Sequence, residues 1–229
     1  MRCGLLKASE DMAMTFRPVN AVVLCGGRSS RMGTAKHLLP AADGKPMYIH
    51  LLTQIAAIEY PVQDLFVSVR DPEAGAKLDG IFVKGRSVGL VYDTSCDSSA
   101  VGPIDVGPAA GLLAAHRHDP TCTWLVLACD YPLITGIELQ ALFDSFDGRL
   151  VCFKNPEGWP EPLIGLWSPE ALERLHENVL QGKTGPRKVI EDLNSTLISP
   201  EDHICLFNAN TRQEWEKGLT LAQERFHSP

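Results

Sequence analysis

The sequence predicts an α/β protein in which helices cover both faces of a mainly parallel sheet, a three-layer α/β/α architecture. From residue 20 onward, apolar runs of strand length alternate with segments of helical periodicity. This order is typical of parallel strands joined by helices. Three of the runs end in small or acidic residues, at Gly26, Asp93 and Asp130. Because ligands bind at the carboxyl ends of such strands, we expect a binding site there.

The first half of the chain is expected to supply four strands and three helices. Continuous apolar runs, which suit strands buried on both faces, lie at residues 21–25, 65–69, 89–93 and 124–130. A helix is expected after Pro46, because apolar residues recur at helical spacing from Met47 to Ile58. Two more are expected at residues 108–116 and around Leu139, Leu142 and Phe143.

The second half is less regular. Strands are expected at residues 149–153 and 162–167, and helices at residues 169–181 and about 211–226. No linker or shift in composition separates the two halves. We therefore expect one domain over residues 20–229, preceded by a mobile leader at residues 1–19.

Composition and charge exclude several classes of protein. The net charge of −7 and the pI near 5.5 argue against a nucleic-acid partner, which would require a basic face. The apolar runs are too short to span a membrane, and the leader carries Glu10 and Asp11 in place of a signal peptide's apolar core. The seven cysteines form no C-x-x-C pair and are odd in number, which favours free, mostly buried thiols in a reducing compartment. We expect a cytoplasmic monomer or small homo-oligomer.

A loop rich in glycine and cations follows the first strand. Gly26 and Gly27 allow the backbone N–H groups to approach a phosphate closely, and Arg28, Arg31 and Lys36 add positive charge. This combination suits a nucleoside triphosphate, although it has the spacing of neither strict phosphate-binding loop. The alternative is a glycine turn carrying solvated cations.

The segment LCGGRSSRMGTAKHLLP resembles the L-x-G-G-x-x-x-R-M-G-x-x-K signature of MobA-like nucleotidyltransferases, the molybdenum cofactor guanylyltransferase family. Four further segments resemble motifs of this family in the same order, and they are GPAAGL (107–112), CDYP (129–132), EPLIGLW (161–167) and FNANT (207–211). The resemblance covers nearly the whole chain after Asn20. It implies a Rossmann-like nucleotidyltransferase (GT-A-like) fold.

The resemblance also implies roles for individual residues. Arg31 and Lys36 would hold the phosphates, and Asp130 would bind Mg²⁺, so that these three residues form the catalytic set. The nucleotide would further be lined by Leu24, Cys25, Gly26, Gly27, Ser68 and Asp93. Ser68 replaces a common asparagine, and Ala35 replaces a common aspartate. The acceptor would face Arg187, Asn208 and Asn210.

Each of these residues also has a purely structural alternative. Asp93 and Asp130 are suited to caps or turns at strand ends, Asn208 and Asn210 to a turn before the last helix, and Arg187 to a solvated face. The chemistry nevertheless agrees with the resemblance. An acceptor phosphate is already a nucleophile, so catalysis needs alignment and charge neutralisation, and Mg²⁺ takes only one or two carboxylates.

The implied reaction is GMP transfer from GTP to a phosphorylated small molecule, molybdopterin, with release of pyrophosphate. Gly26 occupies the position that favours guanylyl over cytidylyl transfer within this superfamily, although the SSRMG segment also resembles the cytidylyl branch. Two alternatives remain open. One is a nucleotidyltransferase of the same fold that uses CTP or a sugar phosphate. The other is a nucleotide-binding accessory protein without turnover.

Overall fold

The structure, a computed structural model, describes residues 18–26, 35–76, 78, 80–93 and 106–227. Several predicted features lie outside the described residues. These are residues 1–17 of the expected leader, Gly27, Arg28 and Arg31 of the glycine-rich loop, and residues 94–105 after Asp93.

Within these residues, eight strands form one sheet in the order β3-β4-β2-β1-β5-β7-β6-β8. Strands β4, β2, β1 and β5 pair in parallel, as do β6 and β8, whereas β7 runs antiparallel to both its neighbours and β3 antiparallel to β4. The bounds are β1 (Val19–Leu24), β2 (Val62–Val69), β3 (Phe82–Val83), β4 (Arg86–Tyr92), β5 (Thr123–Ala128), β6 (Leu150–Lys154), β7 (Pro160–Trp167) and β8 (Thr196–Ile198). The expected mainly parallel sheet is confirmed.

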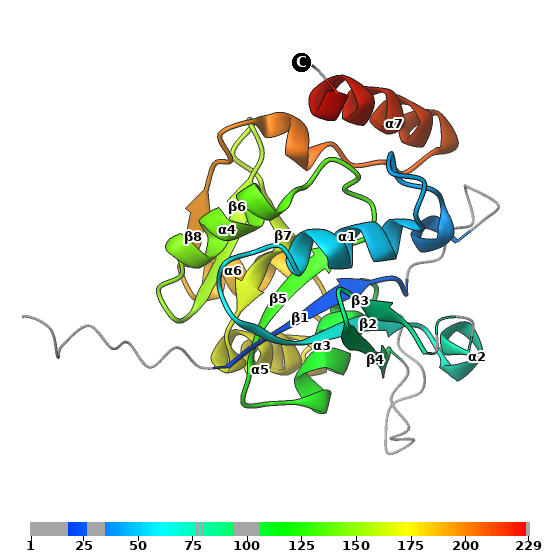
Figure 1. Cartoon of the computed structure of the whole chain (residues 1–229). Helices are drawn as coiled ribbons and strands as arrows, with labels where there is room; N and C mark the ends of the chain where they lie inside the picture. Colours follow the sequence, from blue (N-terminus) through cyan, green and yellow to red (C-terminus); the bar gives the residue numbers. More distant parts are fainter. Residues whose placement is uncertain (1–17, 27–34, 77, 79, 94–105, 228–229) are drawn as a thin grey trace, which may run out of the picture.

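Helices cover both faces of this sheet (Figure 1). The helices are α1 (Met47–Ile55), α2 (Pro72–Gly75), α3 (Ala109–His118), α4 (Gly136–Asp144), α5 (Pro169–Leu180), α6 (Arg187–Asp192) and α7 (Arg212–His227), with short 3-10 helices η1 (Lys36–Leu38) and η2 (His203–Leu206). No helix in the described ranges is long and apolar enough to cross a membrane.

Alternation along the strands divides the buried residues into two cores, because successive strand residues point to opposite faces. Ala21 and Val23 of β1 pack with α1 and α4 on one face, whereas Val22 packs with α3 and α5 on the other. Strand β5 is buried along its whole length. The predicted three-layer α/β/α fold is confirmed.

The structure differs from the sequence-based expectation at element ends and in short elements. Strand β1 begins at Val19, which had been assigned to the leader, and α1 ends at Ile55, before Ile58. The segments α2, α6, β3 and β8 were not expected. They are short or half-exposed, and a few residues give too little periodicity to identify an element.

The C-terminal helix is attached to the rest of the fold by two polar anchors. The Trp215 indole N–H donates to the Pro40 carbonyl at 3.1 Å, and the Arg225 guanidinium donates to the Leu133 carbonyl at 2.8 Å and to Glu138 at 2.6 Å. These contacts hold α7 against the segment that follows η1 and against the loop and helix α4 that follow β5.

Gly165 in β7 provides a test of the central packing. A Cβ at this position would lie 2.4 Å from the Val151 carbonyl oxygen and 2.9 Å from the Cys152 Cβ. Gly165→Ala must therefore push β6 and β7 apart, and we expect it to lower the free energy of unfolding by about 2 to 3 kcal/mol in urea titrations. Gly185→Ala is the matched control, because a Cβ there has no neighbour within 4 Å. Equal stability of the two variants would contradict the described packing.

Candidate active site

The predicted site lies where the carboxyl ends of the parallel strands meet. The backbone ladder continues past β1, because the Cys25 N–H donates to the Ser68 carbonyl at 2.8 Å and the Cys129 N–H donates to the Leu24 carbonyl at 3.3 Å. The Asp93 N–H donates to the Val69 carbonyl at 2.9 Å. These bonds bring the strand-end residues to one edge of the sheet.

Asp93 lies in a tight polar niche formed by three strand ends and a helix. The Ser68 hydroxyl donates to the Asp93 carboxylate. A Cβ on Gly26 would lie 1.6 Å from Asp93 Oδ2, and one on Gly111 would lie 2.8 Å from both Ser68 Oγ and Leu24 Cδ2. The Asp93 carboxylate therefore occupies the space that a side chain at Gly26 would need. This favours glycine at position 26 independently of the expected approach of the backbone to a phosphate.

Burial of the Asp93 carboxylate has an electrostatic consequence. It raises the pKa of Asp93 from its usual 3.8 to about 6, although the Ser68 hydrogen bond and the Arg117 charge act in the opposite direction. A carboxylate that is costly to ionise at a ligand-binding edge is typical of a functional site.

Lys36 joins the donor and acceptor residues predicted from the sequence. Its ammonium lies 3.5 Å from Asp130 Oδ2 and donates to Asn210 Oδ1 at 2.8 Å. The Asn210 side-chain amide in turn donates to Asn208 Oδ1 at 2.7 Å. Four residues that were predicted separately from motifs, Lys36, Asp130, Asn208 and Asn210, thus lie together in the structure.

The segment that carries the two asparagines is held by its backbone. The Ala209 N–H donates to the Asp130 carbonyl at 2.8 Å, and Ala209 is fully buried. The last helix is capped by Thr211 and Glu214, whose side chains each accept a backbone N–H of the other, at 3.2 and 2.8 Å. Because this reciprocal cap satisfies the helix end, the Asn210 side chain is left to contact Lys36.

One oxygen of the Asp130 carboxylate is suited to bind a metal ion. Asp130 Oδ1 is buried and has no hydrogen-bond partner among the described residues. The same part of the chain holds no cluster of three or more His, Cys, Asp or Glu side chains suited to a metal. One carboxylate fits Mg²⁺, which fills most of its octahedron with water and phosphate oxygens. It does not fit a closed zinc site.

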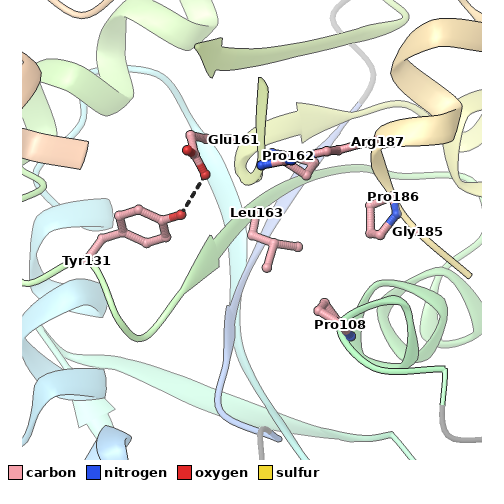
Figure 2. Close-up of a pocket in the computed structure, with 8 residues that line it drawn as sticks. All are labelled: Pro108, Tyr131, Glu161, Pro162, Leu163, Gly185, Pro186 and Arg187. Carbon is pink, nitrogen blue, oxygen red and sulfur yellow. Dashed lines mark hydrogen bonds between the residues drawn. The ribbon is translucent and has the colours of Figure 1, made fainter. Parts of the chain in front are cut away.

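A pocket of about 270 Å³ opens beside this cluster (Figure 2). Figure 2 shows the Tyr131 phenol and the Glu161 carboxylate directed toward one another, joined by a 2.9 Å hydrogen bond that Tyr131 donates. Arg187, predicted to face the acceptor, lines this pocket from the start of α6. The remaining lining residues are Pro108, Pro162, Leu163, Gly185 and Pro186.

Tyr131 and Glu161 were not assigned a role from the sequence. Both lie within motifs that carry the resemblance, CDYP and EPLIGLW. Tyr131 directly follows Asp130, and that adjacency was a signal for its proximity to the site. Glu161 lies in another strand, so only the fold places it beside Tyr131.

Two buried cysteines, Cys25 and Cys129, lie next to each other at the strand ends. Cys25 is buried, and burial together with the neighbouring Cys129 thiol raises the pKa of Cys25 well above its usual value. A thiol kept neutral in this way behaves as a small apolar group. Cys25 is therefore not a reactive thiol, and its N–H is already bonded to the Ser68 carbonyl.

Comparisons with known proteins identify relatives over most of the chain. The profile of the MobA-like NTP transferase domain matches residues 21–197. A molybdenum cofactor guanylyltransferase from Pseudomonas fluorescens is 31% identical over 204 residues, which are 86% of this chain and 91% of that protein. A molybdenum cofactor biosynthesis bifunctional protein from Synechocystis is 27% identical over 90% of this chain, which spans only 54% of that protein.

The fold has a counterpart among solved structures. The crystal structure of molybdopterin-guanine dinucleotide biosynthesis protein A from Archaeoglobus fulgidus superposes with a TM-score of 0.67 at 22% identity, covering 90% of this chain and 99% of that one.

Replacement of the Asp93 carboxylate is expected to stabilise the protein in a pH-dependent manner. Because the pKa of Asp93 is about 6 when folded and 3.8 otherwise, wild-type stability falls as pH rises through this interval. Asp93→Asn keeps the acceptor for Ser68 and cannot ionise. We expect it to exceed the wild type by up to about 3 kcal/mol at pH 7.5 and by little at pH 4.5, in urea unfolding.

Asp64→Asn, on the exposed part of β2, is the matched control and should follow the wild type. A constant difference between Asp93→Asn and the wild type at the two pH values would contradict the raised pKa.

Proposed function

The chain belongs to the MobA-like NTP transferase family, and on that premise we propose that it transfers GMP from GTP to Mo-molybdopterin. The products are molybdopterin guanine dinucleotide and pyrophosphate. Membership of this family makes the chain a nucleotidyltransferase. GTP and Mo-molybdopterin as its substrates are what we propose. They are supported by relatives named as molybdenum cofactor guanylyltransferases at 30% and 31% identity.

The observation that carries the proposal is the pair of contacts made by Lys36. One ammonium lies between the Asp130 carboxylate and the Asn210 amide, at 3.5 and 2.8 Å. A cation beside a carboxylate with a buried, unpartnered oxygen suits a triphosphate and a divalent metal. The asparagines on the other side of Lys36 suit the phosphate of the acceptor.

The reaction needs alignment and charge neutralisation. An acceptor phosphate oxygen forms a bond to the α-phosphorus of GTP, and the bond from that phosphorus to the β-phosphate oxygen breaks, so that pyrophosphate leaves with the electron pair. Lys36 neutralises charge on the phosphates, and Asp130 would hold Mg²⁺. When bound, Mg²⁺ would neutralise charge on the triphosphate and its leaving group. The acceptor phosphate is already anionic, so no general base is required.

Asp93 supports the choice of guanine as the base. An ionised carboxylate only accepts hydrogen bonds, and guanine presents two adjacent donors, N1–H and the 2-amino group. Cytosine presents a single donor group on its corresponding edge. We assign Asp93, held by Ser68, to the guanine edge, with Leu24, Cys25 and Gly26 lining the nucleotide and Gly27 and Arg31 completing the loop.

The proposal also extends to organisation and location. We take residues 20–229 as a single domain that works as a cytoplasmic monomer or small homo-oligomer with no nucleic-acid or membrane partner. Support for a reducing compartment comes from the five described cysteines, which are all buried and unpaired.

A panel of nucleotides tests the proposed reaction. The protein is incubated with Mg²⁺, Mo-molybdopterin and one of GTP, CTP, ATP or UTP, and pyrophosphate release is measured. We expect release with GTP only. Release with CTP, or only when a sugar phosphate replaces molybdopterin, would assign the chain to another reaction of this fold. Binding of GTP without release in any mixture would identify an accessory protein.

Asp130→Asn separates the metal role from packing. It keeps the size of the side chain and removes the charge that would hold Mg²⁺, so we expect pyrophosphate release to fall by about 100-fold or more. The melting temperature should change little, because the Ala209 backbone contact to Asp130 is retained. Asp64→Asn, on the exposed part of β2, serves as the control. Wild-type turnover in Asp130→Asn would refute the metal assignment.

A further inference from the structure

The pocket beside Asp130 combines flat apolar walls with two opposite charges. Pro108, Pro162 and Pro186 supply ring faces, whereas Glu161 and Arg187 supply a carboxylate and a guanidinium. Across the described ranges, neither charged side chain makes an ion pair. Both are therefore left to interact with a ligand that has donors and acceptors on a flat body.

The size of the pocket limits what it can hold. Drug-sized ligands occupy pockets of about 300 to 1,000 Å³, and this one has about 270 Å³. A single fused ring system fits such a volume, whereas a whole nucleotide does not. The pocket is thus suited to one heterocycle whose remaining atoms extend out of it.

The Glu161 carboxylate is held in a defined orientation. Its Oε2 accepts the hydrogen bond of the Tyr131 phenol at 2.9 Å, and only 3% of the Tyr131 surface is exposed. Burial and the charge of Glu161 raise the pKa of Tyr131 far above its usual value, so the phenol remains a donor. The Asn208 side chain acts on the pKa of Tyr131 in the opposite direction, so it lies beside the phenol, and its Oδ1 accepts a hydrogen bond from the Asn210 amide at 2.7 Å.

These contacts connect the pocket to the reacting phosphates. Hydrogen bonds join Glu161 to Tyr131, Asn208 to Asn210, and Asn210 to Lys36, and Asn208 lies beside the Tyr131 phenol. Asp130 and Tyr131 are consecutive residues, so a heterocycle in the pocket would place its phosphate substituent toward Asp130 and Lys36. The pocket therefore belongs to the acceptor side.

We propose that Glu161 binds the 2-amino-4-oxopyrimidine edge of the acceptor's pterin and that Tyr131 is the positioning residue for its carboxylate. This inference rests on the proposed function. The pterin edge carries two adjacent donors, the 2-amino group and N3–H, which a carboxylate accepts together. Its 4-oxo group is an acceptor, and Arg187 is a donor in the same pocket. The three prolines pack against the ring faces.

Two fluorescent probes test this assignment. The first is 6-hydroxymethylpterin phosphate, and the second is its lumazine counterpart, in which an oxo group replaces the 2-amino group. Because both carry the same phosphate, contacts to Lys36 and Asn210 cancel in the comparison. We expect wild-type protein to bind the pterin about tenfold more tightly than the lumazine in fluorescence titrations, since a carboxylate facing an oxo group loses its hydrogen bond.

Glu161→Gln is expected to weaken pterin binding about tenfold and to reduce the pterin-to-lumazine preference to near unity. Tyr131→Phe keeps the ring and removes the hydrogen bond to Glu161, so it should lower the same preference by a smaller factor. Glu157→Gln, on the exposed turn between β6 and β7, is the matched control and should keep the wild-type preference.

An unchanged preference in Glu161→Gln, or the absence of any preference in the wild type, would overturn the assignment. The affinity for GTP, measured on the same samples, keeps this result separate from the proposed function. Wild-type protein that transfers GMP while Glu161→Gln retains full pterin preference refutes only the role of Glu161. Wild-type protein that does not bind GTP refutes the proposed function. Thermal melting of each variant confirms that the comparison is made on folded protein.

Discussion

The bridge formed by the Lys36 ammonium is the interaction on which the organisation of the site depends. Lys36 lies in the segment after β1, and its ammonium contacts Asp130 at the end of β5 and Asn210 in the turn before α7. These partners are 94 and 174 residues away in the sequence. A single cation can occupy this place only because the acidic Asp130 and the amide of Asn210 converge on it. The anchoring of α7 by Trp215 and Arg225 serves this convergence.

Most of the fold could be predicted, because its central strands are continuous apolar runs ending in small or acidic residues. The direction of β7 could not be taken from the parallel pattern. A turn at residues 155–159, closed by the Asn155 N–H to Trp159 carbonyl bond of 2.9 Å, joins β6 directly to β7 and requires antiparallel pairing. Strand β8 has three half-buried residues at the sheet edge, which leave no periodic signal.

The candidate site was predictable to the extent that motifs carry it. Lys36, Asp130, Asn208 and Asn210 were each predicted from a motif, and their side chains are joined by direct contacts. The hydrogen bond between Ser68 and Asp93 could not be predicted from the sequence. It depends on the pairing of β2 with β4, which brings Ser68 next to Asp93. The Tyr131–Glu161 pair depends on the reversal of β7, so the same feature that departed from the expected sheet also created the acceptor-side pocket.

The missing side chain of Gly26 has a consequence for how this chain could vary. A Cβ at Gly26 would lie 1.6 Å from Asp93 Oδ2. A substitution at residue 26 therefore also affects the side chain at residue 93. Enlarging the first displaces the carboxylate of the second from the position in which it is assigned to the base. The effects of changes at these two positions cannot add independently. A redesign of base preference in this scaffold therefore has to treat both positions together, because each one sets the space open to the other.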